Sequence, residues 1–310
     1  MLIASYLLAG LAIVLAWPAP LVLSRVPWTA RSPFTALILW QAIALAGGLS
    51  MIGAMLVWGL EPLGDNLITA LGGLWTVLTG GPLAPALEPV HVFALSTALL
   101  LGSHLVFTLL LSTYRVTRQR HRHRRLLALL SDPSPTEPGT VVLAHGAPVA
   151  YCLPGFGGSL TVLSRGLLDT LDEQGLRAVI AHERAHLDQR HDLLVLAFES
   201  WHHALPWLPT SRLARRAVQE LIEMLADDTA LRQVSADTLL RSLVAVASGA
   251  ASAPGTESGL PGEELSSMRL KRLLSPAGPL PVAGRAGVLA VAALLVLLPT
   301  TLLVAPGLLG

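Results

Sequence analysis

The chain has 310 residues, of which 53% are hydrophobic and only 13% are charged. An ordinary soluble domain carries about 25% charged residues, so this composition argues against one and indicates a membrane protein. The formal net charge of +1 gives no support to a nucleic-acid partner, and the single cysteine excludes an intrachain disulfide.

Long apolar runs occupy the first part of the chain, and a fourth run lies near its end. They cover residues 2–23, 34–60, 90–114 and 281–304. Each is long enough to cross a bilayer as a helix, which takes about 20 residues. No Lys or Arg precedes the first run and no clear cleavage site follows it, so we interpret it as a span rather than a signal peptide. The apolar run 67–78 is too short to cross, and we expect it to lie at the interface or to re-enter.

The charged residues between these runs predict an orientation. Arginines follow the first and third runs, and basic residues precede the fourth, whereas residues 61–89 contain three acidic residues and no Lys or Arg. Because basic residues concentrate in cytoplasmic loops, the N-terminus is expected outside the cell membrane, and the region after the third span in the cytoplasm. We interpret the Arg/His-rich segment 115–125 as an anchor against anionic lipid headgroups rather than as a nucleic-acid site.

The segment His182-Glu183-Arg184-Ala185-His186 matches the His-Glu-x-x-His pattern. Two imidazoles four residues apart share one helix face and can reach one zinc ion, while Glu183 can act as general base on the attacking water. Thr170 and Glu173 form a capping-box pattern, and neither Pro nor Gly interrupts residues 176–198. The motif is therefore expected on one helix that runs through to Phe198.

A second expected helix, over residues 219–231, offers the third metal ligand. Glu223 and Asp227 are four residues apart and share a face, so one carboxylate could bind zinc while the other accepts a hydrogen bond from a ligand imidazole. Glu220, on the same helix, is expected to be a surface carboxylate and stays open as the alternative ligand.

The two motifs together resemble the gluzincin membrane peptidases. Residues Glu223-Met224-Leu225-Ala226-Asp227 are similar to the element that follows His-Glu-x-x-His in the BlaR/MecR-type antirepressor peptidases and in the HtpX/CAAX-prenyl-protease group. Residues 164–168 and 176–192 resemble the BlaR/MecR active-site region in particular. The resemblance covers residues 140–232. It implies one Zn²⁺ per chain, held by His182, His186 and Glu223, with Glu183 as the catalytic base.

Two further carboxylates are expected to support this site, Asp227 by orienting a ligand histidine and Asp192 as a structural group in the same region. No residue stands out as the donor to the transition-state oxyanion, and His191, His203 and Tyr151 stay open. Cys152 lies in an apolar stretch and is expected to be a core residue rather than a nucleophile.

The expected fold is mainly α. It is a polytopic membrane protein with four transmembrane helices and a cytoplasmic gluzincin-like α+β zinc peptidase domain inserted between the third and fourth spans. The division is an N-terminal membrane domain (1–114), a basic juxtamembrane segment and linker (115–139), the peptidase domain (140–280) and the C-terminal transmembrane helix (281–310).

Three short β-rich runs are expected within the peptidase domain, at residues 141–144, 149–153 and 160–163. The resemblance implies that an edge strand pairs with an extended substrate, and the alternative is a hairpin that only covers the active-site helix. Residues 193–208 are expected to rest at the bilayer interface, with His202 and His203 as packing residues. Residues 249–262 are rich in Ser, Gly, Pro and Ala and are expected to form a loop that gates the cleft or is self-cleaved.

The resemblance implies a regulatory protease that cleaves a cytoplasmic winged-helix repressor of the BlaI/MecI type in response to a signal. The chain departs from the β-lactam receptors, because no penicillin-binding domain follows the last span, so direct acylation by a β-lactam is not supported. The alternatives are an HtpX-like protease for membrane protein quality control and a non-catalytic zinc-binding membrane signal transducer, against which Glu183 argues. The expected partners are a protein substrate and the lipid bilayer, with no direct nucleic acid, and a homodimer stays open.

Overall fold

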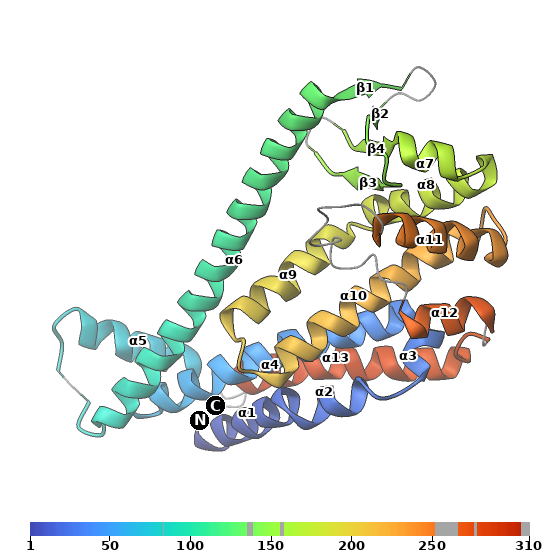
Figure 1. Cartoon of the computed structure of the whole chain (residues 1–310). Helices are drawn as coiled ribbons and strands as arrows, with labels where there is room; N and C mark the ends of the chain where they lie inside the picture. Colours follow the sequence, from blue (N-terminus) through green and yellow to red (C-terminus); the bar gives the residue numbers. More distant parts are fainter. Residues whose placement is uncertain (83, 135–138, 156–157, 252–265, 276–277, 305–310) are drawn as a thin grey trace.

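A computed structural model describes the chain except residues 83, 135–138, 156–157, 252–265, 276–277 and 305–310. The described chain is mainly helical, with one small sheet (Figure 1). Most of the predicted loop 249–262 lies outside the described residues.

Apolar helices form one half of the structure. Within the described chain, four helical segments are long and apolar enough to cross a membrane, at Leu2–Leu23, Pro33–Leu63, Pro89–Leu130 and Val282–Val304. The first consists of α1 (Leu2–Ala16) and α2 (Pro18–Leu23), and the second of α4 (Pro33–Leu60) and the 3-10 turn η1 (Glu61–Leu63). Helices α1 and α13 (Val282–Val304) pack along α4. Several apolar helices of this length indicate a membrane protein.

Two short helices flank α4 at opposite ends of the bundle. Helix α3 (Trp28–Arg31) precedes α4, and α5 (Leu67–Leu78) follows η1. At the N-terminus of α5 the side chain of Asn66 accepts a hydrogen bond from the backbone N–H of Thr69. In Figure 1, α5 lies at the end of the bundle where both chain termini are marked, far from α3.

Helix α6 (Pro89–Leu130) is much longer than a membrane span. At about 1.5 Å per residue its 42 residues extend roughly 63 Å, about twice the thickness of the hydrocarbon core. It leans away from the other apolar helices and reaches the sheet with its far end (Figure 1). The predicted basic segment 115–125 is therefore the second half of this helix. It does not serve lipid headgroups alone, because Arg120 and Arg124 bond to Asp192 and to the Gly158 carbonyl.

The sheet contains β1 (Ser131–Pro133), β2 (Thr140–Leu143), β3 (Ala150–Leu153) and β4 (Leu160–Ser164). The strand order is β1-β2-β4-β3, with β2 and β4 parallel and the other pairs antiparallel. The three predicted strands are confirmed, and β1 is an addition. Strand β3 pairs only with β4 among the described strands, so its other edge is open, and the strand also contacts α8.

The helix that carries the His-Glu-x-x-His motif, α8 (Glu173–Asp188), begins differently from the prediction. Its N-cap is Asp172, whose carboxylate accepts a hydrogen bond from the Gly175 N–H at 2.7 Å. Thr170 instead ends the short helix α7 (Arg165–Thr170), and its hydroxyl donates to the Gly166 carbonyl. The predicted Thr170/Glu173 capping box is therefore wrong, because Thr170 is still helical and Asp172 supplies the cap.

Helix α8 also ends earlier than predicted. Arg190 adopts the left-handed conformation with φ 51°, and a separate helix, α9 (His191–Ala204), begins after it. The expectation of one helix through Phe198 is wrong, although no Pro or Gly marks the break. The turn redirects α9 so that it leaves the sheet and runs back toward the apolar helices (Figure 1).

Helices α9 and α10 (Pro209–Ala230) form a hairpin that inserts among the apolar helices. Its turn residues Ala204, Leu205 and Leu208 cluster with side chains of α1, α4 and α6, namely Ala16, Met51, Leu101 and Leu105. The Thr210 hydroxyl donates to the Leu15 carbonyl at 2.9 Å and also contacts the Ala16 carbonyl. The sequence analysis did not predict this packing of residues 193–208 among the apolar helices.

Polar groups of this turn are paired internally, as an apolar environment requires. The Ser211 hydroxyl contacts the carbonyls of Leu205 and Leu208 at 2.7 and 2.9 Å, and His202 Nδ1 lies 3.2 Å from the same hydroxyl. His104 on α6 bonds the Ala204 carbonyl at 3.1 Å. The turn can therefore lie among apolar helices without leaving these groups unsatisfied.

The largest core cluster joins both halves of the molecule. It combines buried side chains of α1, α2 and α4, such as Trp40 and Ile43, with Phe198 of α9, Val218 and Ile222 of α10 and Ala292 of α13. The remaining helices, α11 (Ala236–Ala251) and α12 (Ser267–Leu274), contact each other, and they pack on α8 and α10, respectively. The hairpin that carries Glu223 is thus supported directly by the apolar bundle.

Candidate active site

Two histidines of α8 and one glutamate of α10 converge as the sequence predicts. His182 Nε2 lies 3.3 Å from His186 Nε2 and 3.3 Å from Glu223 Oε2, while His186 Nε2 lies 3.5 Å from Glu223 Oε1. One ligand atom from each of the three residues falls within 4.8 Å of the others. Helical spacing explains the histidine pair, since residues i and i+4 lie one above the other on a helix face.

Asp227 lies behind His182. Its Oδ1 is 3.1 Å from His182 Nδ1, and both side chains are almost fully buried. A neutral ring that carries its proton on Nδ1 and points it at a carboxylate leaves the Nε2 lone pair directed at His186 and Glu223. A carboxylate behind a metal-binding imidazole fixes the ring and raises its basicity. The structure thus places Asp227 where the sequence predicts it.

A chain of side chains orients His186 from behind, and the sequence did not predict it. His186 Nδ1 lies 3.1 Å from His191 Nδ1, and His191 Nε2 lies 3.2 Å from Gln189 Oε1. The Gln189 amide in turn donates to the Thr229 hydroxyl at 3.0 Å. One protonation pattern satisfies all three contacts, with His191 protonated on Nε2 and His186 on Nδ1. That pattern directs the His186 Nε2 lone pair into the cluster.

His191 therefore contacts His186 and Gln189. It is buried, and both of its ring nitrogens are used in the chain just described. Among the other two open candidates, Tyr151 bonds His123 Nε2 through its hydroxyl at 2.7 Å, and His203 Nδ1 contacts the Glu199 carbonyl at 2.7 Å.

Arg269 of α12 is the main site residue that sequence reasoning missed. Its side chain is only 3% exposed, and Nε and Nη2 donate to the two Asp227 oxygens at 2.9 and 2.8 Å. Its Nη1 also lies 3.1 Å from Glu223 Oε2. Arg269 lies 42 residues after Asp227 in the chain, so no local spacing in the sequence pairs the two residues.

Burial and charge set the protonation of the cluster. Burial lowers the pKa of His186 to about 4, so this ring is neutral near pH 7. Burial also acts to lower the pKa of His182, but hydrogen bonds to Asp227 and Glu223 outweigh it and raise that pKa to about 9. The pKa of Glu223 is lowered, because His182, His186 and Arg269 together outweigh the effect of burial. The pocket therefore favours a positive charge between the carboxylates, which a proton or a metal ion can supply.

This donor set fits a catalytic metal site. Two imidazole nitrogens and one carboxylate are the ligands of many catalytic zinc centres, which keep one position open for water or substrate. His182 Nε2 and His186 Nε2 lie 3.3 Å apart, so one shared cation, either a proton or a metal ion, can satisfy both nitrogens.

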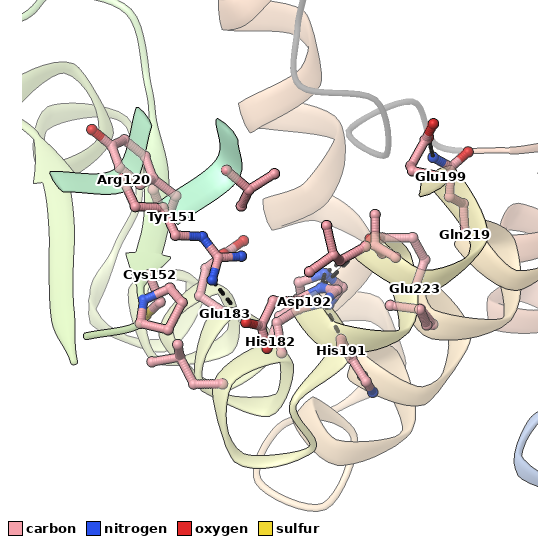
Figure 2. Close-up of a pocket in the computed structure, with 18 of the residues that line it drawn as sticks. Arg120, Tyr151, Cys152, His182, Glu183, His191, Asp192, Glu199, Gln219 and Glu223 are labelled. Carbon is pink, nitrogen blue, oxygen red and sulfur yellow. Dashed lines mark hydrogen bonds and ion pairs between the residues drawn. The ribbon is translucent and has the colours of Figure 1, made fainter. Parts of the chain in front are cut away.

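A cavity of about 630 Å³ opens in front of this cluster. Figure 2 shows Glu183 and His182 between Arg120, Tyr151 and Cys152 on one side and Glu223, Gln219 and Glu199 on the other. Glu183, beside His182, lines this cavity and is half-buried. The edge strand β3 also contributes to the wall through Ala150, Tyr151 and Cys152. The cavity therefore lies between β3 and the cluster of His182, His186 and Glu223.

Helix α6 forms the opposite wall, which the sequence did not predict. Thr108, Leu111 and Ser112, within the third apolar run, line the cavity together with Arg115, Val116 and Arg120. Arg120 Nη1 donates to Asp192 Oδ2 at 2.9 Å, so Asp192 ties α6 to the start of α9. Asp192 thus has a structural contact at the cavity rim, as predicted in general terms, but its partner is an arginine of α6.

Two other predicted residues differ in their placement. Glu220 accepts a hydrogen bond from the Ser266 hydroxyl at 2.6 Å and is not part of the cluster. Cys152 is half-buried rather than a core residue and lines the cavity. Burial raises the pKa of its thiol, with a contribution from Glu183, which agrees with the prediction that Cys152 is not a nucleophile.

The comparison with protein families fits this geometry. Residues 116–253 match the sequence model of Peptidase family M48. The match begins within α6, at the cavity wall, and ends just after α11, so it includes both cluster histidines, Glu183 and Glu223. No curated protein matches the chain. The chain therefore carries a domain similar to peptidase family M48, which implies metalloprotease activity and supports a metallopeptidase of the membrane type.

Proposed function

We propose that this chain is a membrane-embedded zinc metalloendopeptidase. The observation that supports it most directly is the convergence of His182, His186 and Glu223 at one end of a cavity that also exposes Glu183 and an open strand edge. A purely structural zinc site is usually closed by four protein ligands, and no fourth His, Cys, Asp or Glu joins the three within the described chain.

The residues have distinct tasks in this proposal. His182, His186 and Glu223 hold the zinc ion, which when bound would polarise the scissile carbonyl and make water a better nucleophile at neutral pH. Glu183 accepts the proton of the attacking water and delivers it to the leaving amine. Asp227 and His191 keep the two histidine rings in the orientation that the metal requires.

The substrate would bind as an extended chain along β3. The free edge of this strand offers backbone N–H and C=O groups to a peptide, in the manner of β-strand addition. Ala150, Tyr151 and Cys152 bring this edge to the cavity that contains Glu183. Strand pairing places the backbone of any sequence near the general base, and side-chain pockets of the cavity then select among sequences.

We propose that the N-terminus lies outside and that the cavity faces the cytoplasm. Arg31 donates to the Gly278 carbonyl at 3.0 Å, which brings the loops before α4 and α13 to one end of the bundle. Arg25 and Arg31 precede α4, and the basic residues of α12 precede α13, whereas Glu61, Asp65 and Glu88 belong to the segment at the other end. The distribution follows the rule that basic loops remain in the cytoplasm.

A cytoplasmic winged-helix repressor of the BlaI/MecI type is the substrate that we propose first. Support comes from the resemblance of residues 164–192 to the BlaR/MecR region, and from the order of three apolar segments, peptidase and one apolar segment. In this role the enzyme would cut the repressor after a signal reaches the apolar helices. The core shared by α4 and α10 gives such a signal a direct mechanical route to Glu223.

Quality control of membrane proteins is the second candidate, because one observation favours it. Thr108, Leu111 and Ser112 line the cavity although they belong to an apolar helix long enough to cross a bilayer. A substrate in the cavity would therefore lie beside the membrane, where a damaged membrane protein exposes its loops. The non-catalytic signal transducer is the third alternative.

A comparison of cells that produce wild type or Glu183→Gln tests these roles. The variant keeps all three ligands, so it should bind zinc with unchanged affinity and lose hydrolysis by about 10²- to 10⁴-fold. Cytosolic and membrane proteins are then compared for fragments that depend on Glu183. A single cut DNA-binding repressor supports the regulatory role, and many membrane-protein fragments support quality control. Identical profiles under all inducing conditions would contradict both and favour the non-catalytic alternative.

A further inference from the structure

A second cavity, of about 690 Å³, lies beside the last turns of α10 and shares no lining residue with the peptidase cavity. Its walls come from the α3–α4 connection, the end of α10, α12 and the beginning of α13. These elements lie together at one end of the bundle, away from α5 (Figure 1). Four arginines line the cavity, namely Arg31, Arg232, Arg272 and Arg285.

Among the described residues, acidic groups do not balance the charges of this cavity. Asp228 is the one acidic residue in this part of the chain that lines it, and Arg272 Nη2 already pairs with Asp228 at 2.7 Å. For Arg31, Arg232 and Arg285 the described residues provide no ion-pair partner, and Arg31 uses its Nε to bond the Gly278 carbonyl. About three positive charges therefore converge on one cavity, an arrangement that favours an anionic ligand.

The N-terminus of α4 adds to this preference. Ser32 is its N-cap and Pro33 its first residue, and both line the cavity. This helix has 28 residues, so its first turn carries the partial positive charge of a long helix, although Pro33 has no N–H and the Ser32 N–H donates to the Thr29 carbonyl. Arginine side chains and a helix N-terminus together are a common combination for phosphate groups.

The position of the cavity identifies the source of the phosphate. Arg31 precedes α4 and Arg285 lies in the first turn of α13, so both occur where apolar helices begin. Phe34, 59% exposed, lines the same cavity and offers an apolar surface beside the arginines. A ligand with a phosphate and an adjoining acyl chain matches this pair of surfaces, as basic pockets between membrane helices do for anionic lipids.

We propose that this cavity binds the phosphate headgroup of an anionic membrane phospholipid. The proposal concerns a site apart from the peptidase cavity and does not rest on the proposed peptidase function. The two sites are nevertheless connected through side-chain contacts. Gln189 and Thr229 line the lipid cavity, and their hydrogen bond is the far end of the chain that orients His191 and His186.

The test uses the full chain, purified in a neutral detergent and stripped of lipid. Dioleoyl phosphatidylglycerol is titrated in, and bound lipid is counted by native mass spectrometry, with dioleoyl phosphatidylcholine and inorganic phosphate as separate arms. The variant Arg232→Gln/Arg285→Gln removes two cavity charges. The control Arg177→Gln/Arg241→Gln removes two charges from the surface of α8 and α11, where both arginines are exposed and paired within their own helices.

We expect one tightly bound phosphatidylglycerol per chain in wild type and in the control. Its dissociation constant should rise about 25-fold in the cavity variant, about five-fold for each arginine removed. Phosphatidylcholine should bind weakly and without dependence on the variants. Equal affinities of the cavity variant and the control would overturn the proposal. If inorganic phosphate bound as tightly as phosphatidylglycerol and displaced it, the assignment of the ligand as a lipid would be wrong. A thermal melt of each variant shows that the chain remains folded.

Discussion

The guanidinium of Arg269 donates two hydrogen bonds to the carboxylate of Asp227, at 2.9 Å from Nε and 2.8 Å from Nη2. Asp227 is the residue that also faces His182 Nδ1. The short helix before the last apolar segment is therefore fixed to the carboxylate behind His182, a candidate metal ligand. The position of that histidine depends on α12 as well as on α8 and α10.

Removing this arginine should be costly. In Arg269→Gln the buried carboxylates of Asp227 and Glu223 lose their cation, and a broken buried ion pair typically lowers the free energy of unfolding by about 3–5 kcal/mol. Thermal unfolding in detergent measures the loss. Arg241→Gln is the matched control, because its partner Asp237 is mostly exposed and little change is expected. Equal melting temperatures for both variants would refute the prediction.

The choice between the two candidate glutamate ligands can be tested by metal affinity. Glu223→Gln replaces the carboxylate that faces both histidines, so the dissociation constant for Zn²⁺ should rise by more than the roughly 100-fold that loss of an outer partner can cause. Glu220→Gln should leave it nearly unchanged, because Glu220 bonds Ser266 instead. Competition with a coloured chelator measures both constants. If Glu220→Gln gave the larger loss, the ligand assignment would be wrong.

His191 should contribute to metal binding without touching the metal. In His191→Phe, His186 Nδ1 loses its acceptor at 3.1 Å, and the affinity for Zn²⁺ should fall about 10- to 100-fold. His191→Asn places an amide oxygen near the position of Nδ1 and should restore most of the affinity. The absorption spectrum of the Co²⁺-substituted protein should shift in the Phe variant and return in the Asn variant. Equal losses in both would indicate a packing role only.

Cys152 gives a probe of the peptidase cavity, because it is the single cysteine of the chain. Burial raises its pKa, so less thiolate is present at a given pH than for a free thiol. Iodoacetamide should therefore alkylate the folded protein more slowly than the unfolded protein at pH 8, and faster as the pH increases. Mass spectrometry follows the adduct.

The adduct should also inhibit hydrolysis, since Cys152 lines the cavity that contains Glu183. Cys152→Ser should keep its activity and resist iodoacetamide. Rapid alkylation at neutral pH, or full activity of the adduct, would contradict the placement of this side chain.

Local patterns in the sequence predicted the parts of the site that are local. The spacing of His182 and His186 follows from one helix, and the spacing of Glu223 and Asp227 from another, so each pair could be identified without knowledge of the fold. The apolar runs and the short strands could be recognised in the same way, because period and length are properties of a single segment.

Contacts between distant segments could not be predicted. Arg269 meets Asp227 only because α12 folds back onto α10, and Arg120 meets Asp192 only because α6 continues far beyond the length of a span. The break at Arg190 was missed for another reason. A left-handed residue usually reveals itself as Gly or Asn, and here an arginine adopts that conformation at φ 51°.

The core shared by α4 and α10 has one more consequence. Ile222 belongs to the same buried cluster as Trp40 of α4, and Glu223 is its immediate neighbour in the chain. Glu223, the residue proposed to bind the metal, therefore directly follows a residue that is packed against the apolar bundle. A rotation or tilt of α4, of the kind that a change in bilayer thickness imposes, would therefore be transmitted to the carboxylate itself. The packing of the apolar helices is thus part of the scaffold that positions Glu223.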